Sequence, residues 1–544
     1  MTNNTYREAS WPRWIPWILG VLALAFYVSI RARDISIGSS AQHLNAVCGY
    51  YFLPITVHYL YTLLGSVFIR WAPGSPLLDM TLFSALCGSF SVMLFYHIMA
   101  RLTRYDLEGH EIAPDMDETC SRFGSLVATL LFAVSLPLWF CSSRPQSLIF
   151  DLLLLLSSIA LLLRYKKEDA GHGWLLASVF LYGLGITEYV TMAVLSPLFG
   201  IAVAYLMLRR GQFTPLKIWM TLAAGILGLL FYLIPVTLMA RTHDYGYGEY
   251  ANAWAIFMDL IKKQYREFKQ GFPQVGGLLL LLFTFVPWCY TYFIPKSLRS
   301  AHAQPLNLTT ITLLVLNGLG LFLLTELWFS PSQIVGGMDR VVLPYLFIAS
   351  WAGYLAGYWR LKAKMSSDTF SSTAWRWFWT IAALINLLSP PVIAAIQIQR
   401  IKPFEISSMA VFTQNIIRST SDRKILVTSG GVMDDMLLYF SREEDPSRRL
   451  VFTTLLSKPS VRAYYSLLYP EAGLVKEGAF STSDFIKTLI TSNALGVKGC
   501  AFTHPDMALS IGFQALPNGL VVFPVDDLKT KDPDTVFEAN QRLL

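Results

Sequence analysis

The sequence has 544 residues, of which 54% are hydrophobic and only 15% are charged. Soluble proteins carry about 25% charged residues, so this composition excludes a protein that is soluble along its whole length. The net charge of +7 follows from short loops that carry Lys and Arg, and we predict no nucleic-acid partner. The six cysteines form no CxxC pair and no Cys/His cluster, which argues against a disulfide framework and a metal site built on cysteine.

Apolar segments that predict membrane helices follow one another from the N-terminus to residue 398. A spanning helix needs about 20 mostly apolar residues. The first segment follows Arg7 and Arg13 without a small-residue cleavage site, so we interpret it as a retained helix and not as a signal peptide. The predicted spans are 12–30, 79–100, 123–140, 147–163, 173–188, 190–208, 217–240, 275–294, 307–327, 341–359 and 375–397.

The stretch 46–70 is less apolar than its neighbours, and the distribution of basic residues decides its interpretation. Cytoplasmic loops of membrane proteins carry an excess of Lys and Arg. If 46–70 lies along the membrane surface and the N-terminus is cytoplasmic, the basic loops all fall on the cytoplasmic side, and the outer connections are nearly bare. We therefore predict eleven spans, an interfacial helix at 46–70 and a C-terminal domain on the outer side.

The predicted domains are a transmembrane domain, 1–398, and a water-soluble α/β domain, 399–544. The transmembrane domain has long outer loops at 31–78 and 241–274, the second with an amphipathic stretch from Tyr250 to Phe268. In the C-terminal domain, apolar β-type runs alternate with helical patterns, which predicts an α/β sandwich with a largely parallel sheet. The predicted strands are 424–429, 449–455, 499–503 and 520–524, and the predicted helices are 434–440 and 482–492.

Several segments of the transmembrane domain carry a resemblance to a known family. The segments are Leu60–Gly65, Leu82–Gly88, Ser135–Trp139, Gln146–Leu153, Gly183–Pro197 and Arg340–Tyr345. In this order they resemble the protein O-mannosyltransferase-like family, long catalogued as a domain of unknown function within the GT-C glycosyltransferase superfamily. The resemblance implies a GT-C-like fold whose first outer loop bears juxtamembrane helices. It also implies a polyprenyl-phosphate-linked sugar as donor, with a protein or a glycan as acceptor.

Several positions depart from the pattern of that family: both acids of one window are missing, its His-Pro-Pro element is replaced by Phe52–Thr56, and a third acid is replaced by Gln. The family's Asp-x-Gly-Glu-Phe window is similar to Ser39–His43 here, so Gln42 stands where the family has Glu, and the family's Glu before Val-Tyr falls on Gln146. Replacing Glu by Gln keeps the shape and loses the base. A catalytically inactive scaffold or interaction subunit is therefore an alternative function. A transporter of lipid-linked substrates is a third, although the sequence shows no internal repeat and no matching pair of broken half-helices.

Glycosyl transfer from a lipid phosphate needs a carboxylate that deprotonates the acceptor hydroxyl. The leaving phosphate needs cationic side chains or a divalent ion, Mg²⁺ or Mn²⁺, and the sequence leaves that choice open. We predict Asp34 and Glu188 as catalytic residues. Asp34 follows the first span at the outer interface, where a solvated charge cluster is the alternative. Glu188 interrupts two apolar runs, and ionisable groups within membrane segments mark functional sites; a short hairpin in which Glu188 meets water is the alternative.

The remaining predicted site residues would bind the substrate. Asp151 lies one turn inside the fourth span, where pairing with Arg144 is a structural alternative. Arg340 has the planar, permanently charged group that suits phosphate, with anchoring of the third outer loop as the alternative. The full predicted set is Arg31, Arg33, Gln42, His43, Arg144, Gln146, Asp151, Asp339 and Arg340. The one-sided spread of Lys and Arg favours a bacterial inner membrane with the N-terminus cytoplasmic and the C-terminal domain periplasmic.

Overall fold

The structure is a computed structural model in which the chain forms two compact units. The helical unit contains residues 1–31, 81–230 and 263–404, and the mixed unit contains residues 32–80, 231–262 and 405–544. Each unit combines several segments of the chain, so the two units do not test the predicted domain boundary at 398/399, which stays a prediction. The structure describes residues 14–35, 39–51, 58–72, 74–103, 105, 114–166, 171–241, 253–271, 277–279, 281–293, 308–327, 330–335, 341–365, 372–401, 407–420, 423–429, 433–452, 482–492, 499–518 and 520–525.

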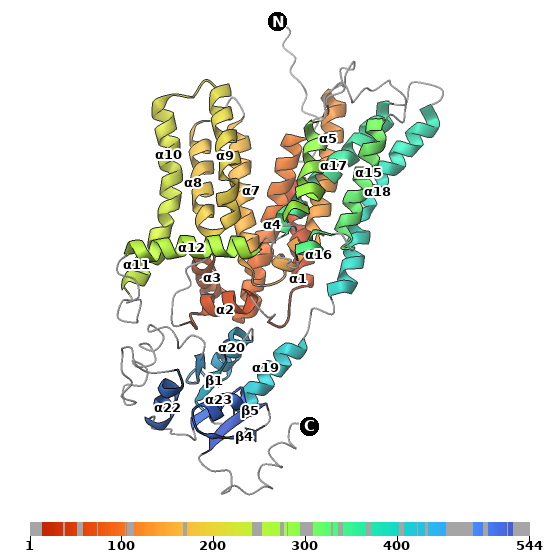
Figure 1. The fold of residues 1–544 in the computed structure, drawn as a ribbon. Helices are drawn as coiled ribbons and strands as arrows, with labels where there is room; N and C mark the ends of the chain where they lie inside the picture. Colours follow the sequence, from red (N-terminus) through yellow and green to blue (C-terminus); the bar gives the residue numbers. More distant parts are fainter. Residues whose placement is uncertain are drawn as a thin grey trace. The chain divides into compact units, whose positions relative to one another are not determined.

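Helices occupy every segment that the sequence predicts to span the membrane (Figure 1). Boundaries agree most closely at α8, which has the predicted bounds 173–188. Breaks within the segments come at Pro and at local changes of helix type, such as the π-helical stretch Leu281–Phe285 before Pro287. The helices are α1 (Ile15–Ser29), α4 (Pro76–Leu102), α5 (Pro114–Ala133), α6 (Leu136–Ser142), α7 (Ser147–Tyr165), α8 (Gly173–Glu188), α9 (Val190–Arg209), α10 (Pro215–Leu229), α11 (Leu233–Arg241), α14 (Val286–Phe293), α15 (Leu308–Leu324), α17 (Val342–Met365) and α18 (Ser372–Ile401).

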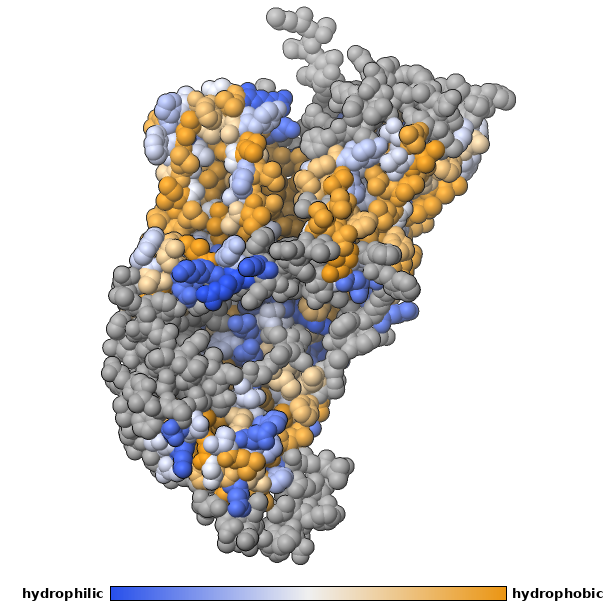
Figure 2. Space-filling view, viewed as in Figure 1, coloured by the Kyte–Doolittle hydropathy of each residue, from blue (hydrophilic) through white to orange (hydrophobic). Residues whose placement is uncertain are grey.

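Five helical segments of the described chain are long and apolar enough to cross a membrane. The predicted span 123–140 falls within a bent pair, α5 and α6, which meet at 60° and make a sixth only if the pair is counted as one span. Pro137 lies in the first turn of α6, at this bend. Four further apolar helices are shorter, so the count of eleven spans stays a prediction. Hydrophobic residues cover most of the visible surface of α8–α10 and of α15 and α18 (Figure 2), as expected for helices that face lipid.

Helix α17 forms the centre of the helical unit, and most of its residues are buried. Small residues let its neighbours approach closely. A Cβ atom added to Gly353 would lie 2.4 Å from the Cβ of Ala128 in α5. Trp351 and Trp359 are among the largest fully buried side chains of the described residues. An apolar helix that is buried all round is the core of a bundle, so α17 is the axis against which α5, α15 and α18 pack.

The first helices of the mixed unit are α2 (Ser39–Cys48) and α3 (Tyr59–Trp71), in the connection between α1 and α4. The predicted single helix over 46–70 is therefore wrong: the chain forms two helices, and α2 starts before the predicted stretch. Glycine causes the break, because Gly49 has a φ of 70° and ends α2. The predicted amphipathic stretch is confirmed as α12 (Ala253–Gly271). In its mixed-unit part, Ile256 and Leu260 pack with Tyr232, Val236 and Met239.

The C-terminal part of the mixed unit contains a five-stranded sheet in the order β2-β1-β3-β5-β4. Strands β1 (Ile425–Thr428), β2 (Arg449–Phe452) and β3 (Cys500–Phe502) are parallel, as predicted. Strands β4 (Gln514–Asn518) and β5 (Val521–Val525) form an antiparallel hairpin, and β5 also pairs antiparallel with β3. The sheet is therefore mixed, and the prediction of a largely parallel sheet is wrong. The sequence predicted one strand, 520–524, at this edge, where the structure has the hairpin of β4 and β5.

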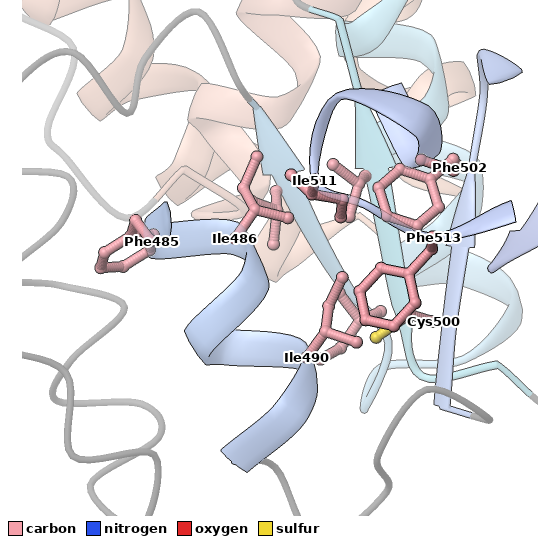
Figure 3. Packing of buried hydrophobic residues seen from close by; sticks show 11 residues of the cluster. Phe485, Ile486, Ile490, Cys500, Phe502, Ile511 and Phe513 are labelled. Carbon is pink, nitrogen blue, oxygen red and sulfur yellow. The ribbon is translucent and has the colours of Figure 1, made fainter. Parts of the chain in front are cut away.

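Helices cover both faces of the parallel strands, of which β1 and β3 are fully buried. On one face, α22 (Thr482–Ser492) contributes Phe485, Ile486 and Ile490, which pack on Cys500 and Phe502 of β3 (Figure 3). On the other face, α19 (Ser407–Ser419) and α20 (Asp434–Glu444) supply Ile416, Ile417, Leu437 and Leu438. Parallel strands are typically buried on both faces in this way. The described residues thus show the predicted α/β domain in part, as a small sheet with helices packed on it, and α23 (Pro505–Ser510) is an element that the sequence did not reveal.

Candidate active site

Two of the predicted site residues, Asp151 and Glu188, come together inside the helical unit. Asp151 lies one turn inside α7, and Glu188 is the last residue of α8. Their side-chain carboxylates approach to within 4.8 Å. Asp151 is 0% exposed and Glu188 is 2% exposed. The alternative in which Glu188 lies in a water-exposed hairpin is therefore wrong, because protein atoms surround its side chain.

Two carboxylates this close interact strongly. Placing two negative charges in a buried site is costly, so such pairs share a proton or bind a cation. Both residues belong to apolar helices, where a buried acid costs folding energy and indicates a function. The pair is thus able to accept a proton from a bound hydroxyl group, or to supply two oxygen ligands to a hard divalent cation.

The turn that presents Glu188 is braced from several sides. Helix α8 lies against α10 without side chains between them: a Cβ added to Gly183 would be 2.3 Å from the carbonyl oxygen of Gly225. The hydroxyl of Tyr182 donates to the carbonyl of Met192 across the α8–α9 turn at 2.7 Å. Tyr189 is extended and separates the two helices. These contacts fix the end of α8, and with it the main chain of Glu188.

Helix α12 adds a contact that the sequence analysis missed. Gln264 is 7% exposed, and its Nε2 donates to the carbonyl of Thr187 at 3.0 Å. Thr187 precedes Glu188, so α12 supports the turn that carries the acid. The amphipathic pattern of α12 predicted a buried face, and Gln264 continues the line of Ile256 and Leu260 at intervals of four residues. A polar residue in that line was the available signal.

Arg144 and Gln146 lie just before α7 and are both buried, each 5% exposed. The Arg144 guanidinium stacks over the ring of Phe140, 4.2 Å from its centre. Gln146 is the N-cap residue of α7, and its backbone N–H donates to the Ser84 hydroxyl at 3.5 Å. The two residues therefore lie in the connection from α6 to α7, seven and five positions before Asp151.

The predicted residues after α1 lie on the surface. Arg31, in the helical unit, is half-buried, and Arg33 and Asp34, in the mixed unit, are exposed. On α2, Gln42 is exposed. The exposure of Asp34 fits the alternative of a solvated charge cluster as well as a catalytic acid, so its catalytic role stays a prediction.

His43 differs from its neighbour Gln42, because its ring is buried. The rings of His58 and Tyr61 lie 5.5 and 5.4 Å from it, both in edge contact. Burial, with the nearby His58 as a second cause, lowers the pKa of His43 to about 3. The ring is therefore neutral at physiological pH, and it would meet a substrate as a neutral hydrogen-bonding group. The sequence analysis missed His58, a non-glycine residue with a φ of 56° at the start of α3.

The connection from α15 to α17 contains a buried acid of a different kind. Glu326 has a φ of 61°, is 2% exposed, and accepts hydrogen bonds from the hydroxyls of Ser332 and Tyr345. The bond from Tyr345 ties this connection to α17. Asp339 and Arg340 lie outside the described residues, so both the phosphate-binding role of Arg340 and its anchoring alternative stay predictions.

These features define an integral membrane protein with a pair of buried acids among its apolar helices. Residues 58–214, which include Arg144, Gln146, Asp151 and Glu188, match the family described as Protein O-mannosyl-transferase TMEM260 N-terminal domain. The predicted resemblance to protein O-mannosyltransferases is thereby confirmed over this stretch. No curated protein matches the chain.

Solved structures with similarity to the chain include these three. ArnT from Cupriavidus metallidurans, bound to undecaprenyl phosphate, is 13% identical, with 96% of this chain and 100% of that chain covered and a TM-score of 0.48. The oligosaccharyltransferase of Archaeoglobus fulgidus, tethered with an acceptor peptide, is 10% identical over 81% of this chain, with a TM-score of 0.43; the match spans 64% of its length. The same organism's AglB, in complex with an inhibitory peptide and a dolichol-phosphate, is 9% identical over 95% of this chain and 75% of that chain, with a TM-score of 0.45.

Proposed function

We propose that this protein is a membrane glycosyltransferase that moves a sugar from a polyprenyl-phosphate donor to a protein or glycan acceptor on the outer face of the membrane. The observation that carries the proposal is the buried pair Asp151 and Glu188, within 4.8 Å of each other and inside the stretch that matches the O-mannosyl-transferase domain. A buried acid pair has no evident use in a passive membrane anchor. It suits a reaction that removes a proton from a hydroxyl group.

In the proposed reaction, Glu188 is the general base. Its carboxylate takes the proton of the acceptor hydroxyl as the acceptor oxygen forms a bond to the anomeric carbon of the sugar. The bond between that carbon and the phosphate oxygen breaks, and the polyprenyl phosphate leaves with the electron pair. Glu188 suits this role because it ends α8 at a braced turn, whereas Asp151 lies within the continuous helix α7.

The leaving phosphate needs positive charge. Arg144 is the nearest predicted cation in the sequence to the start of α7, and its guanidinium remains charged when buried. A divalent cation is the second source of charge that we propose to test. Asp151 and Glu188 offer the carboxylate oxygens that Mg²⁺ and Mn²⁺ prefer, and Mg²⁺ sites often combine one or two carboxylates with substrate phosphate.

The proposal is tested with purified full-length protein and a panel of radiolabelled polyprenyl-phosphate sugars, with Mg²⁺ or Mn²⁺ added or with a chelator. Transfer of label from any one donor is the expected result. Loss of transfer with the chelator and its return with added metal would support the metal role. Absence of transfer from every donor, with and without metal, would contradict the proposed activity.

A catalytically inactive scaffold is the second candidate function. Gln42 and Gln146 favour it, because both stand where the resembling family has acids. Gln42 is exposed and Gln146 caps a helix, so neither position here offers a base. The two functions separate in one comparison: a scaffold would bind the donor lipid without turnover, whereas an enzyme would release labelled product.

We further propose the orientation and location that the basic loops favour: a bacterial inner membrane, with the N-terminus cytoplasmic and the C-terminal domain periplasmic. The test is labelling of intact cells with a membrane-impermeant thiol reagent. A cysteine introduced at the exposed Asp506 should react, whereas one at Arg209, in a basic loop, should react only after permeabilisation. The reverse pattern would contradict the orientation.

A further inference from the structure

Within the mixed unit, helix α2 of the first outer loop packs against helix α20 of the C-terminal domain. The residues that meet are about 390 positions apart in the sequence. The amide Nδ2 of Asn45 donates to the main-chain carbonyl of Asp435 at 2.7 Å. The hydroxyl of Tyr51 donates to the Asp435 carboxylate. The hydroxyl of Tyr50 donates to Oε1 of Glu443 at 2.8 Å.

Local geometry explains why both tyrosines reach α20. Helix α2 ends in a glycine motif, in which the N–H of Gly49 bonds to the carbonyl of Ala46 and the N–H of Tyr50 to that of Asn45. The left-handed Gly49 reverses the chain, so Tyr50 and Tyr51 leave the helix axis. Both rings pack on the apolar cluster that includes Leu437 and Leu438 of α20.

The contact is polar and apolar at once, and its central groups are buried. Asn45 is 0% exposed. Burial raises the pKa of Asp435, although the hydrogen bond from Tyr51 acts in the opposite direction. A buried hydrogen bond that loses its partner costs more than a surface one, so this contact holds one arrangement of α2 on α20.

The same helix α2 carries two of the predicted substrate-binding residues. His43 points its ring at His58 and Tyr61, while Asn45, two residues later, meets Asp435. Helix α2 therefore has α20 on one side and the start of α3 on another. Any shift of α20 would move Gln42 and His43 with it.

We propose that the C-terminal domain positions the first-loop helix α2, and that Asp435 is the positioning residue that Asn45 and Tyr51 hold. The functional part of this inference rests on the proposed glycosyltransferase activity, because Gln42 and His43 matter only if α2 lines the substrate site. The contact itself is measurable without substrate.

The experiment measures hydrogen exchange of the full-length protein in nanodiscs. In Asp435→Ala, the amides of 39–51 should exchange at least about tenfold faster, the scale of losing a hydrogen bond to a charged group. Tyr51→Phe removes the bond from the loop side and should give a similar increase. The double variant should add little, because both changes remove one interaction. Unchanged exchange of 39–51 in both single variants would overturn the proposal.

Two controls keep the test specific. Asp506 lies in the first turn of α23, as Asp435 does in α20, but it is exposed; Asp506→Ala should leave 39–51 unchanged. Asp435→Asn keeps an acceptor for Tyr51 and should restore protection to within about twofold of wild type. The exchange of the amides of β1 and β3 reports whether the sheet stays folded. If Asp435→Ala disturbs the sheet, Tyr51→Phe replaces it as the test variant, because Tyr51 lies outside the sheet.

Transfer assays on the same variants separate the two proposals. If wild type transfers sugar, Asp435→Ala should lose activity and Asp435→Asn should keep it. If wild type shows no transfer while the exchange of 39–51 responds as expected, the positioning contact stands and the proposed activity fails. If transfer occurs and Asp435→Ala matches wild type in both rate and exchange, the positioning role fails and the activity stands.

Discussion

The buried acids of the helical unit fall into two contrasting regions. In the loop before α17, the carboxylate of Glu326 accepts hydrogen bonds from two hydroxyls. The backbone of Glu326 is left-handed, and these bonds help to hold it in that conformation. At the end of α8, Glu188 instead lies beside a second carboxylate, Asp151. A carboxylate met by donors stabilises the loop that carries it. Two carboxylates side by side repel each other when both are ionised, and perturbed acids of this kind cluster at functional sites.

The largest effect is expected at the acid pair. Asp151→Asn and Glu188→Gln should each reduce sugar transfer by about 10²- to 10⁴-fold, the range for general acid–base groups. The double variant should lose little more than the worse single variant, because residues that act together are not additive. Initial rates with saturating donor measure this. Losses that multiply would show that the two carboxylates act independently.

Glu326 should show the opposite behaviour. Glu326→Ala leaves the Ser332 and Tyr345 hydroxyls without their acceptor and should lower the free energy of unfolding by about 3 kcal/mol. Glu326→Gln keeps one acceptor oxygen and should cost less. Thermal unfolding in detergent measures the stability, and transfer by Glu326→Gln should stay near the wild-type rate. A Glu326→Gln protein that is stable but inactive would remove the distinction between the two regions.

Asp435 in the mixed unit extends the comparison to an acid with a tyrosine donor. Burial raises its pKa, so its ionised form is disfavoured in the folded state. Its contribution to stability is greatest below the ordinary pKa of about 3.9, and it falls as pH rises through the folded pKa. At pH 7, Asp435→Asn should therefore match or exceed the wild-type unfolding temperature. The free energy of unfolding of Asp435→Ala should be lower than that of wild type by about 1 kcal/mol. A large loss in Asp435→Asn alone would contradict this.

The smallest effect is expected at the half-buried pair Lys424 and Asp445, whose charged atoms are 2.8 Å apart. Hydrogen bonds from Lys424 and Ser447 lower the pKa of Asp445. The stabilisation is therefore present above the ordinary pKa of about 3.9 and is lost as pH falls through the lowered pKa. Because the pair is partly solvated, Lys424→Ala should cost less than about 1 kcal/mol at pH 7. If wild type stayed more stable than Lys424→Ala at a pH where Asp445 is fully protonated, the stabilisation could not come from this ion pair.

How far the sequence predicts the fold depends on whether a signal is local. Helix α8 ends at Glu188, where the apolar run ends, and α22 has the predicted bounds 482–492. Both were predictable because the periodicity of a helix depends on residues that are close together in the sequence. The hairpin of β4 and β5 was missed because β4 contains Pro517 and exposed residues and reads as a loop. Gly49, a single residue, divided a segment that hydropathy treats as continuous.

The candidate site shows the same limit more clearly. Asp151 and Glu188 each stood out as acids among apolar residues, but their proximity depends on how α7 and α8 pack and on the close approach of Gly183 to α10. Gln264 showed only as a polar residue in the apolar line of α12, and Asp435 gave no signal. Each acts through a residue far away in the chain, Thr187 in one case and Asn45 and Tyr51 in the other, and periodicity holds no information on such pairs.

The measurement that tests the central claim most directly compares wild type with Glu188→Gln in two assays, binding of a radiolabelled polyprenyl-phosphate sugar and transfer of its label to acceptor. We predict that both proteins bind the donor with similar affinity, that wild type transfers the sugar, and that Glu188→Gln does so at least about 100-fold more slowly. Equal transfer rates would contradict the role of the acid pair. Donor binding by both proteins with turnover by neither would favour the inactive scaffold.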